Sequence, residues 1–226
     1  MSSNAPLVSV SVSPRQAGLA LGAKRVLDVF LATLILILAS PLLIVTAVAI
    51  KLDSDGPVFF RQRRIGRGGR SFAMLKFRSM VSDANPELHR KFVKALLRDS
   101  ESVGVDAREP TYKVADDPRV TRVGRVIRRL SIDELPQLFN VLKGEMSLVG
   151  PRPDVPYAVE EYEPWQWRRF EVLPGITGLW QVSGRSKLSP IEMLRLDLEY
   201  VERCSLWLDC KLLVKTIPVV LRKVGS

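Results

Sequence analysis

The chain has 226 residues, 46% of them hydrophobic, and a formal net charge of +10 at pH 7. This length accommodates one compact domain with an accessory element, and the charge indicates an anionic partner: nucleic acid, anionic lipid or a phosphorylated substrate. A single histidine, His89, excludes an HExxH zinc site and a histidine-rich metal cluster, and it lies in a charged stretch that does not suit a Ser-His-Asp triad. The two cysteines, Cys204 and Cys210, have no metal-ligand spacing and favour free thiols in a reducing compartment.

The N-terminal part contains a membrane element. Residues 1–22 are polar and rich in small residues, and we predict a disordered leader there. Residues 29–50 form an uncharged run of 22 residues, which as a helix is long enough to cross a hydrocarbon core of about 30 Å. The run is too long and begins too late for a cleaved signal peptide, so we predict that it stays in the membrane.

Two features bear on how this run lies in the membrane. Ser40-Pro41 falls near its middle; the proline should bend the helix, and the serine can bond a freed carbonyl. Basic residues flank the run on both sides, Lys24 and Arg25 before it and Lys51 after it, and basic flanks prefer the cytoplasm. A hairpin that enters and leaves by the same leaflet satisfies both flanks. From the residues alone, a spanning helix with a proline kink remains the alternative.

The next segment is expected to form short extended pieces around a basic turn. Residues 71–80 (SFAMLKFRSM) are strand-like, and residues 63–70 (RRIGRGGR) form the turn. No GK[ST] follows the glycines, so the turn is not a P-loop, and contact with anionic lipid headgroups is the favoured role. Residues 83–116, which include His89, are predicted to be a surface helix and a variable loop.

The strongest chemical pattern lies in residues 122–153, where the adjacent carboxylates Asp133 and Glu134 stand between arginines. Guanidinium groups match phosphate oxygens with a planar donor fork. The carboxylates are then left to act as nucleophile, base or metal ligand. The arginines are Arg122, Arg125, Arg128 and Arg129 before the acid pair and Arg152 after it.

A structural reading of the same pair stays open. Residues 131–134 (SIDE) have the form of a capping box, ahead of a helix with an apolar face that ends at Gly144. Asp133 and Glu134 could therefore serve only as capping residues. Arg122 and Arg129 are interpreted as surface charge.

Three further segments complete the chain. Residues 165–170 (WQWRRF) have a composition typical of a membrane interface. The turn-rich residues 174–186 offer Gln181, Ser183 and Arg185 as pocket-lining groups, and residues 207–221 suit a helix lying in the interface plane.

Taken together, four blocks resemble the bacterial sugar transferases, the polyprenyl-phosphate hexose-1-phosphate transferases or monotopic phosphoglycosyl transferases. The resemblance reaches from Lys24 to Leu221, and four blocks in the same order make it very specific. The chain is similar to the small, exopolysaccharide-initiating members that lack an N-terminal helix bundle. The blocks are KRVLDVFLA…SPLL (24–43), GPVFFRQRRIG…FAMLKFRSM (56–80), residues 117–153 and PGITGLWQVSGR (174–185).

The resemblance implies an architecture. The fold class is α+β and mainly helical, with a re-entrant membrane helix-hairpin, interfacial amphipathic helices and a small cytosolic catalytic domain. The implied divisions are a disordered leader (1–22), a re-entrant helix broken at Ser40-Pro41 (23–52) and a catalytic domain at the membrane surface (53–226). The implied location is the cytoplasmic face of the bacterial inner membrane.

It also implies a reaction: transfer of a sugar 1-phosphate from a UDP-sugar to undecaprenyl phosphate, with release of UMP. Asp133 is expected to be the nucleophile that forms a phosphosugar-enzyme intermediate, and Glu134 to bind Mg²⁺ and assist proton transfer. Phosphate-binding roles are expected for Arg128, Arg152, Lys76 and Arg78. The partners are the UDP-sugar, polyprenyl phosphate and membrane lipid, without nucleic acid; a homo-oligomer is left open, and glucose or galactose is the favoured sugar.

Two other functions compete with this reading. Asp53-Ser54-Asp55 has the form of the DxD metal site of ordinary glycosyltransferases, but only the leader and the membrane run precede it. A membrane-tethered basic adaptor explains the charge but not an acid pair among arginines. Asp55 and residues 130–132 (LSI) depart from the family's common pattern, and neither departure alters the acid pair.

Overall fold

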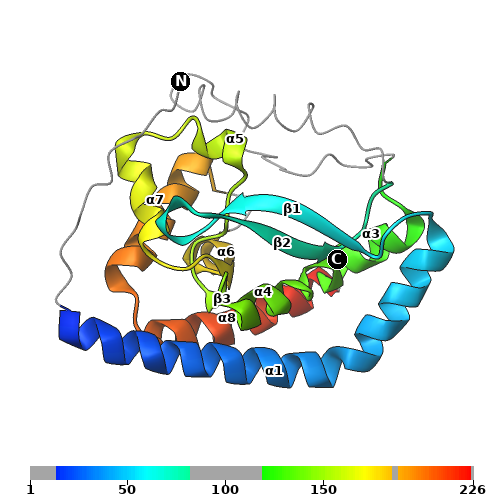
Figure 1. Cartoon of the computed structure of the whole chain (residues 1–226), viewed down its shortest axis with the longest axis horizontal. Coiled ribbons are helices and arrows are strands. Elements are labelled where there is room, and N and C mark those ends of the chain that lie inside the picture. The colour runs from blue at the N-terminus through cyan, green and yellow to red at the C-terminus, as the bar shows by residue number, and fades with distance from the viewer. Residues whose placement is uncertain (1–13, 82–118, 185–187, 225–226) are drawn as a thin grey trace.

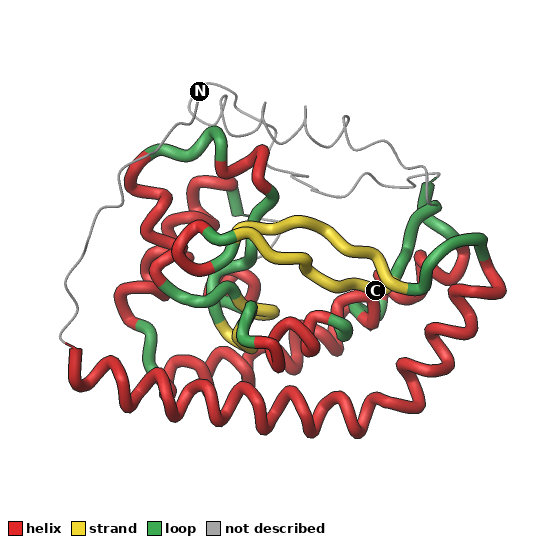
Figure 2. Tube along the Cα trace, viewed as in Figure 1, coloured by secondary structure: helices red, strands yellow, loops and turns green. Residues whose placement is uncertain are grey.

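The computed structural model describes residues 14–81, 119–184 and 188–224, with side chains between residues 21 and 219 of these ranges. The expectations for residues 1–13, for 83–116 with His89, and for Arg185 lie outside them. The described chain is mainly helical and contains two small sheets (Figures 1 and 2). This confirms the predicted α+β class.

The first sheet is a hairpin of β1 (Phe59–Ile65) and β2 (Ser71–Phe77), which pair antiparallel from Phe59↔Phe77 to Ile65↔Ser71. The connecting turn contains the 3₁₀ segment η1 (Arg67–Gly69). Gly68 and Gly69 have φ values of 66° and 73°, which glycine adopts without steric cost. The predicted strand is confirmed over residues 71–77, and the predicted turn is shorter than expected, because residues 63–65 belong to β1.

The second sheet pairs β3 (Ser147–Val149) in parallel with β4 (Gly175–Thr177). The helix predicted to end at Gly144 is confirmed, because Gly144 closes α4 with a φ of 81°. The helical elements after the hairpin are α3 (Arg122–Arg129), η2 (Ile132–Glu134), α4 (Gln137–Lys143), α5 (Pro156–Val159), η3 (Pro164–Glu171), α6 (Leu179–Ser183), α7 (Pro190–Arg203) and α8 (Leu206–Val224).

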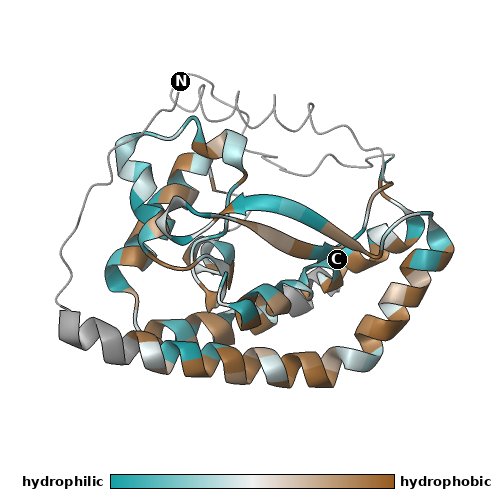
Figure 3. Ribbon diagram, viewed as in Figure 1, coloured by the Kyte–Doolittle hydropathy of each residue, from teal (hydrophilic) through white to brown (hydrophobic). Residues whose placement is uncertain are grey.

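A long helix, α1 (Pro14–Asp53), lies along the outside of these elements. Figure 1 shows it running past α8 and α4 and then turning toward α3. Its residues 21–53 are long and apolar enough to cross a membrane, and only 11% of the most apolar window is buried in the molecule. Figure 3 shows that much of α1 consists of hydrophobic residues. Among them, 62–84% of the surface is exposed at Phe30, Ile37, Leu38, Ile44, Val45 and Leu52.

The bend in α1 has a local explanation. Pro41 is the proline inside the helix, and it cannot donate a hydrogen bond to the carbonyl of Ile37. Ser40 Oγ donates to that carbonyl at 2.8 Å, as the sequence predicted. The helix nevertheless continues through Ser40-Pro41, so the structure has one bent helix rather than two helices joined by a break. It also begins at Pro14, inside the segment 1–22 that was expected to be disordered.

The first half of α1 is anchored to the globular part by polar contacts. Lys24 Nζ donates to Val149 O at 3.0 Å and lies 2.5 Å from Asp209 Oδ2 of α8. Arg25 donates to two carbonyls at the C-terminal end of α4, Val141 O at 2.5 Å and Leu142 O at 2.8 Å. Cations suit helix C-termini because carbonyls are left unpaired there.

The last turn of α1 is anchored to the same body. Arg78, directly after β2, donates to Ile50 O at 3.3 Å and to Ser54 O at 2.6 Å. Asp53 Oδ2 accepts the Val123 N–H at 3.0 Å. Both ends of the apolar run are therefore fixed to one compact unit. Its core is shared by α1 (Ala32), β2 (Met74), α4 (Leu138 and Val141), β3 (Leu148), α7 (Tyr200) and α8 (Leu212).

Candidate active site

The acid pair lies on η2, the 3₁₀ turn between α3 and α4. Ser131 precedes the turn in the left-handed conformation, with a φ of 59°, and makes no capping bond through its side chain. An N-cap normally needs extended backbone angles, so the predicted capping box is wrong. A non-glycine residue at positive φ stores local strain, and here it lies two residues before Asp133.

Two cations hold Glu134. Arg152 Nη2 lies 2.7 Å from Glu134 Oε1, and Arg152 Nη1 donates to Oε2 at 3.4 Å, so the pairing is bidentate. Lys76 Nζ reaches Oε1 at 3.5 Å. The side chains of Glu134 and Arg152 are each 27% exposed and that of Lys76 is 17% exposed, so this cluster is in contact with solvent. We call Asp133, Glu134, Lys76 and Arg152 the acid-pair centre.

The pKa shifts in this centre follow from burial and charge. Burial lowers the pKa of Lys76 to about 8, and the charge of Glu134 opposes this. The charge of Glu134 raises the pKa of Arg152 against the effect of burial. The charge of Asp133 also raises the pKa of both Lys76 and Arg152. All four side chains therefore belong to one electrostatic site.

A second cluster of charges supports the loop that carries Arg152. Arg169 of η3 donates through Nη2 to Arg152 O at 2.7 Å and to Asp197 Oδ2 at 2.6 Å. Its Nη1 contacts both Asp154 and the Tyr162 hydroxyl. Arg169 and Asp197 have side chains only 4% and 2% exposed. We call Asp154, Tyr162, Arg169 and Asp197 the buried arginine centre.

The pKa values of two groups in the buried arginine centre favour their ionised forms. Burial lowers the pKa of Arg169, but Tyr162, Asp154 and Asp197 together raise it above its usual value. Burial alone would raise the pKa of Asp154, yet Arg169 and Tyr162 hold it below its usual value. Asp154 is also held through its backbone, because its carbonyl accepts the Ile65 N–H at 2.9 Å.

The hairpin adds one more contact to the Arg152 loop. Arg64 of β1 donates to Pro153 O at 2.9 Å, and burial lowers its pKa to about 10. Sequence reasoning missed Arg64, Asp154, Tyr162, Arg169 and Asp197. Residues 167–170 (WRRF) were interpreted as a membrane interface because tryptophan and arginine are common there. A single sequence gives no indication that Arg169 pairs with Asp154 and Asp197, which are distant along the chain.

The remaining predicted site residues are placed as follows. Arg128 is half-buried in the last turn of α3, which packs against η2. Arg78 is directed to backbone carbonyls at the end of α1, and Asp55 O accepts from it at 2.6 Å. Gln181 of α6 is buried and donates to Ile176 O at 2.8 Å. The exposed positions of Arg122 and Arg129 confirm their interpretation as surface charge.

Asp53 of the competing DxD motif is tied to the start of α3, because hydrogen bonds from the Thr121 side chain and the Val123 N–H lower its pKa. Across residues 14–81, 119–184 and 188–224, the structure contains no group of three or more histidine, cysteine or acidic side chains that could hold a metal.

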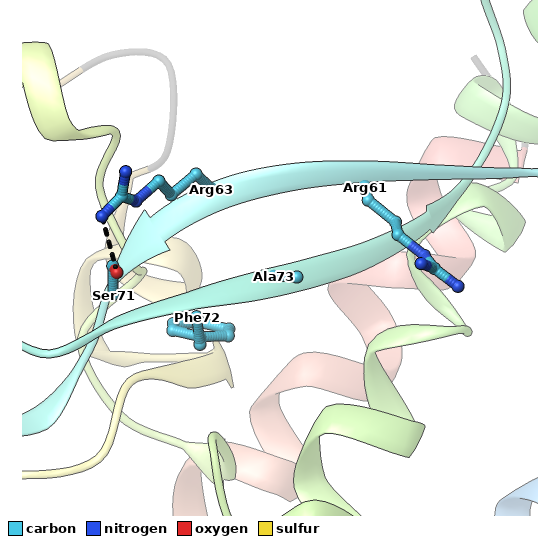
Figure 4. Close-up of a pocket in the computed structure, with 5 residues that line it drawn as sticks. All are labelled: Arg61, Arg63, Ser71, Phe72 and Ala73. Carbon is cyan, nitrogen blue, oxygen red and sulfur yellow. Dashed lines mark hydrogen bonds between the residues drawn. The ribbon is translucent and has the colours of Figure 1, made fainter.

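A hollow of about 400 Å³ lies elsewhere, on the β1–β2 hairpin. Figure 4 shows Arg63 reaching Ser71, with a bond of 3.1 Å, while Arg61 points away from both. Successive side chains of a strand face opposite sides. Arg61, Arg63 and Ser71 therefore lie on the face of the hairpin opposite Lys76, so the hollow is not the site of the acid pair.

The fold and site define a membrane-associated chain with an arginine-bound acid pair, and the comparison with known families identifies it. The chain belongs to the bacterial sugar transferase family, whose model matches residues 19–223.

Three curated relatives illustrate this membership. The exopolysaccharide production protein ExoY of Rhizobium meliloti is 42% identical over 207 residues, which cover 90% of this chain and 88% of that protein. The UDP-glucose:undecaprenyl-phosphate glucose-1-phosphate transferase of Caulobacter vibrioides is 43% identical over 206 residues, 88% of this chain and 69% of that protein. The undecaprenyl-phosphate galactose phosphotransferase of Salmonella typhimurium is 43% identical over 203 residues, 90% of this chain but 41% of that protein. The chain thus spans less than half the length of the Salmonella relative.

Proposed function

We propose that this protein transfers a hexose 1-phosphate from a UDP-sugar to undecaprenyl phosphate and thereby initiates exopolysaccharide assembly. The observation that carries the proposal is the acid-pair centre: Glu134 is bound by Arg152 and Lys76, directly beside Asp133. The relatives named for glucose and galactose phosphotransfer support a hexose as the sugar.

The chemistry proceeds in two displacements. The Asp133 carboxylate attacks the β-phosphorus of the UDP-sugar, the bond from that phosphorus to the bridging oxygen breaks, and UMP leaves. A phosphate oxygen of the polyprenyl phosphate then attacks the same phosphorus and releases the Asp133 carboxylate. One pyrophosphate bond is broken and one is made, so the overall free-energy change is small.

The cations give this route its electrostatic basis. A carboxylate and a diphosphate repel each other, and positioned positive charges in a partly dehydrated site offset that repulsion. Arg152 and Lys76 are already fixed by Glu134, so they require little rearrangement when the diphosphate arrives. Arg128, in the helix that packs against η2, is the further phosphate-binding residue we propose. Both terminal nitrogens of Arg78 bond backbone carbonyls at the end of α1, and we assign this residue to the fold.

The acid pair also fits a magnesium ion that arrives with the nucleotide. Mg²⁺ is typically held by one or two carboxylates together with substrate phosphate oxygens and water. Glu134, with Asp133 beside it, provides that number of carboxylates. When bound, the ion would neutralise phosphate charge.

We further propose that α1 enters and leaves the membrane by the cytoplasmic leaflet. Lys24 and Arg25 near its start and Asp53 at its end contact the same globular unit, which supports placing both ends on one side. A helix spanning the bilayer would have to carry one of these anchors to the opposite face. Shallow insertion would keep the acid pair at the surface where a soluble nucleotide sugar meets a lipid phosphate.

The decisive experiment uses the purified full-length protein in lipid nanodiscs and UDP-glucose or UDP-galactose labelled in the β-phosphate, without polyprenyl phosphate. Wild type should retain covalent label, Asp133→Asn should retain none, and turnover of the variant should fall at least about 1,000-fold. Arg122→Gln, at an exposed position of α3, is the matched control and should label like wild type. Equal labelling of wild type and Asp133→Asn, or none in wild type, would overturn the covalent route.

Membrane topology needs a separate test. Cysteines introduced at Ala23 and Leu52, in a background with Cys204 and Cys210 replaced by serine, should react with an impermeant thiol reagent only from the cytoplasmic side of membrane vesicles. Labelling of the two positions from opposite sides would show a spanning helix and disprove the re-entrant arrangement.

A further inference from the structure

Asn140 of α4 has a set of contacts that neither the acid pair nor the family membership explains. Its side chain is fully buried, at 0% exposed. Its Oδ1 accepts the Leu75 N–H at 2.9 Å, and its Nδ2 donates to Ala73 O at 2.8 Å and to Glu145 Oε2 at 2.7 Å. One carboxamide thus makes three hydrogen bonds of good length.

These contacts complete the outer edge of β2. The strand pairs with β1 on one side only, within a two-stranded sheet. Ala73 and Leu75 are two residues apart, so their backbone groups face the same, outer edge. The Asn140 amide gives that edge one donor and one acceptor, as the N–H and C=O of one residue in a neighbouring strand would. Aspartate offers no N–H, and an apolar side chain offers neither group.

We call Asn140 and its three hydrogen bonds the clamp. The clamp joins the two segments whose side chains meet in the acid-pair centre. Leu75 directly precedes Lys76, and Asn140 follows Glu134 by six residues through η2 and α4. Lys76 and Glu134 are 3.5 Å apart, so a small shift of β2 relative to α4 would part them. Glu145 holds the amide from its other side, which fixes the plane in which Asn140 meets the strand.

We propose that Asn140 is a positioning residue of the transferase reaction, one that sets the register of β2 against the η2–α4 segment and so places Lys76 at Glu134. This proposal rests on the proposed function, because the distance between Lys76 and Glu134 affects a reaction rate only if these side chains take part in the transferase reaction. Asn140 itself does not touch the substrate. Its influence is on the rate of the first displacement rather than on nucleotide binding.

The test is Asn140→Asp, which keeps the shape and the acceptor toward Leu75 but places an oxygen against Ala73 O and the Glu145 carboxylate. We expect the rate constant for phosphosugar-enzyme formation to fall about 10- to 100-fold, since misplacements of about 1 Å cost up to that amount. The fraction of enzyme that finally carries label should stay at the wild-type value, and the KM for the UDP-sugar should change less than about threefold. A merely structural role would lower the labelled fraction and leave the rate constant of the folded molecules unchanged.

A matched variant strengthens the test. Glu145→Gln retains an acceptor for Asn140, so alone it should react at close to the wild-type rate. Combined with Asn140→Asp, it supplies an N–H toward the carboxylate introduced at position 140 and removes one negative charge, and should restore roughly half of the loss on a logarithmic scale. A double variant no faster than Asn140→Asp would count against the clamp.

A readout independent of catalysis separates this proposal from the proposed function. Asn140→Ala removes the acceptor for the Leu75 N–H, so hydrogen exchange at Leu75 should accelerate while amides of α7 keep their protection. Unchanged exchange at Leu75, or an Asn140→Asp enzyme that forms the intermediate at the wild-type rate, would overturn the positioning role. If wild type forms no intermediate while Leu75 exchange still responds, the proposed reaction fails and the clamp is only structural.

Discussion

The two charged centres of this protein have similar composition but different surroundings. The acid-pair centre and the buried arginine centre each set arginine against carboxylates at hydrogen-bonding distance. In the first, the side chains of Arg152 and Glu134 are each 27% exposed. In the second, those of Arg169 and Asp197 are 4% and 2% exposed, although that of Asp154 is 35% exposed. An accessible arginine can also bind a substrate phosphate, while a buried one cannot release its partner without leaving an unpaired charge. The exposure of the arginine, 27% for Arg152 against 4% for Arg169, therefore separates a reactive role from a supporting role.

The two centres meet in one short loop. The Arg152 guanidinium binds Glu134 in the first centre, and the Arg152 carbonyl accepts from Arg169 in the second. Asp154, two residues later, belongs to the second centre. The buried charges thus hold the backbone from which the reactive arginine extends, and separate variants can test this division.

The largest effect is expected from Arg169→Met, which leaves Asp197 buried without its cation. Breaking a buried pair from one side costs about 3–5 kcal/mol, so the midpoint of denaturant unfolding should fall strongly. The measurement is equilibrium unfolding in detergent micelles followed by tryptophan fluorescence. Arg169→Met combined with Asp197→Leu should recover part of the loss; a double variant that is less stable than Arg169→Met would show that the pair itself is not the cause.

Arg152→Lys should have the opposite effect: it should lower activity and leave stability nearly unchanged. The positive charge stays, but the bidentate fork to Glu134 and to a phosphate is lost. We expect kcat/KM to fall by about 10- to 100-fold, equivalent to roughly 1.4–2.8 kcal/mol, with little change in unfolding because the pair is partly exposed. Steady-state release of UMP measures the first quantity. A large loss of stability without loss of activity would reverse the roles assigned to the two centres.

The acid-pair centre should also respond to pH through Lys76, whose pKa burial lowers to about 8. Above that pH the ammonium loses its charge, so kcat/KM should decline, and Lys76→Arg should remove the decline because arginine stays charged. Between about 8 and the unfolded value of 10.5, the unfolded chain holds more protons, so the Lys76 contribution to stability rises with pH. Activity and this contribution therefore move in opposite directions, and rate and unfolding measurements from about pH 7 to 10 compare them directly.

The accessible centre could be predicted from the sequence, and the buried one could not. Asp133, Glu134 and Arg152 lie close together along the chain among characteristic neighbours, so their pattern survives in one sequence. The partners of Arg169 lie 15 and 28 residues away, at positions with no distinguishing composition. The role of Arg78 could not be predicted from the sequence either. It binds backbone carbonyls, and because every residue has a carbonyl, no sequence pattern marks its partners.

Local signals succeeded where the backbone itself decides the structure and failed where tertiary packing overrides it. Ser40 bonds the carbonyl that Pro41 leaves unpaired, and Gly144 ends α4 in a left-handed conformation, both as expected. The SIDE motif predicted a capping box, yet Ser131 itself is left-handed. Packing of α3 and β2 against the turn that carries the acid pair sets its conformation.

The smallest effect is expected from Tyr162→Phe, within the buried arginine centre. The Tyr162 hydroxyl bonds Asp154 and Arg169, and burial raises its pKa, so it remains a protonated donor. Its loss should cost about 1 kcal/mol of stability, the usual net value of one hydrogen bond, because Asp154 and Asp197 still hold Arg169. Arg152 should keep its place, so kcat/KM should change by less than about threefold. An activity loss as large as that of Arg152→Lys would mean that the hydroxyl orders the Arg152 loop by itself, and the two centres would then act as one.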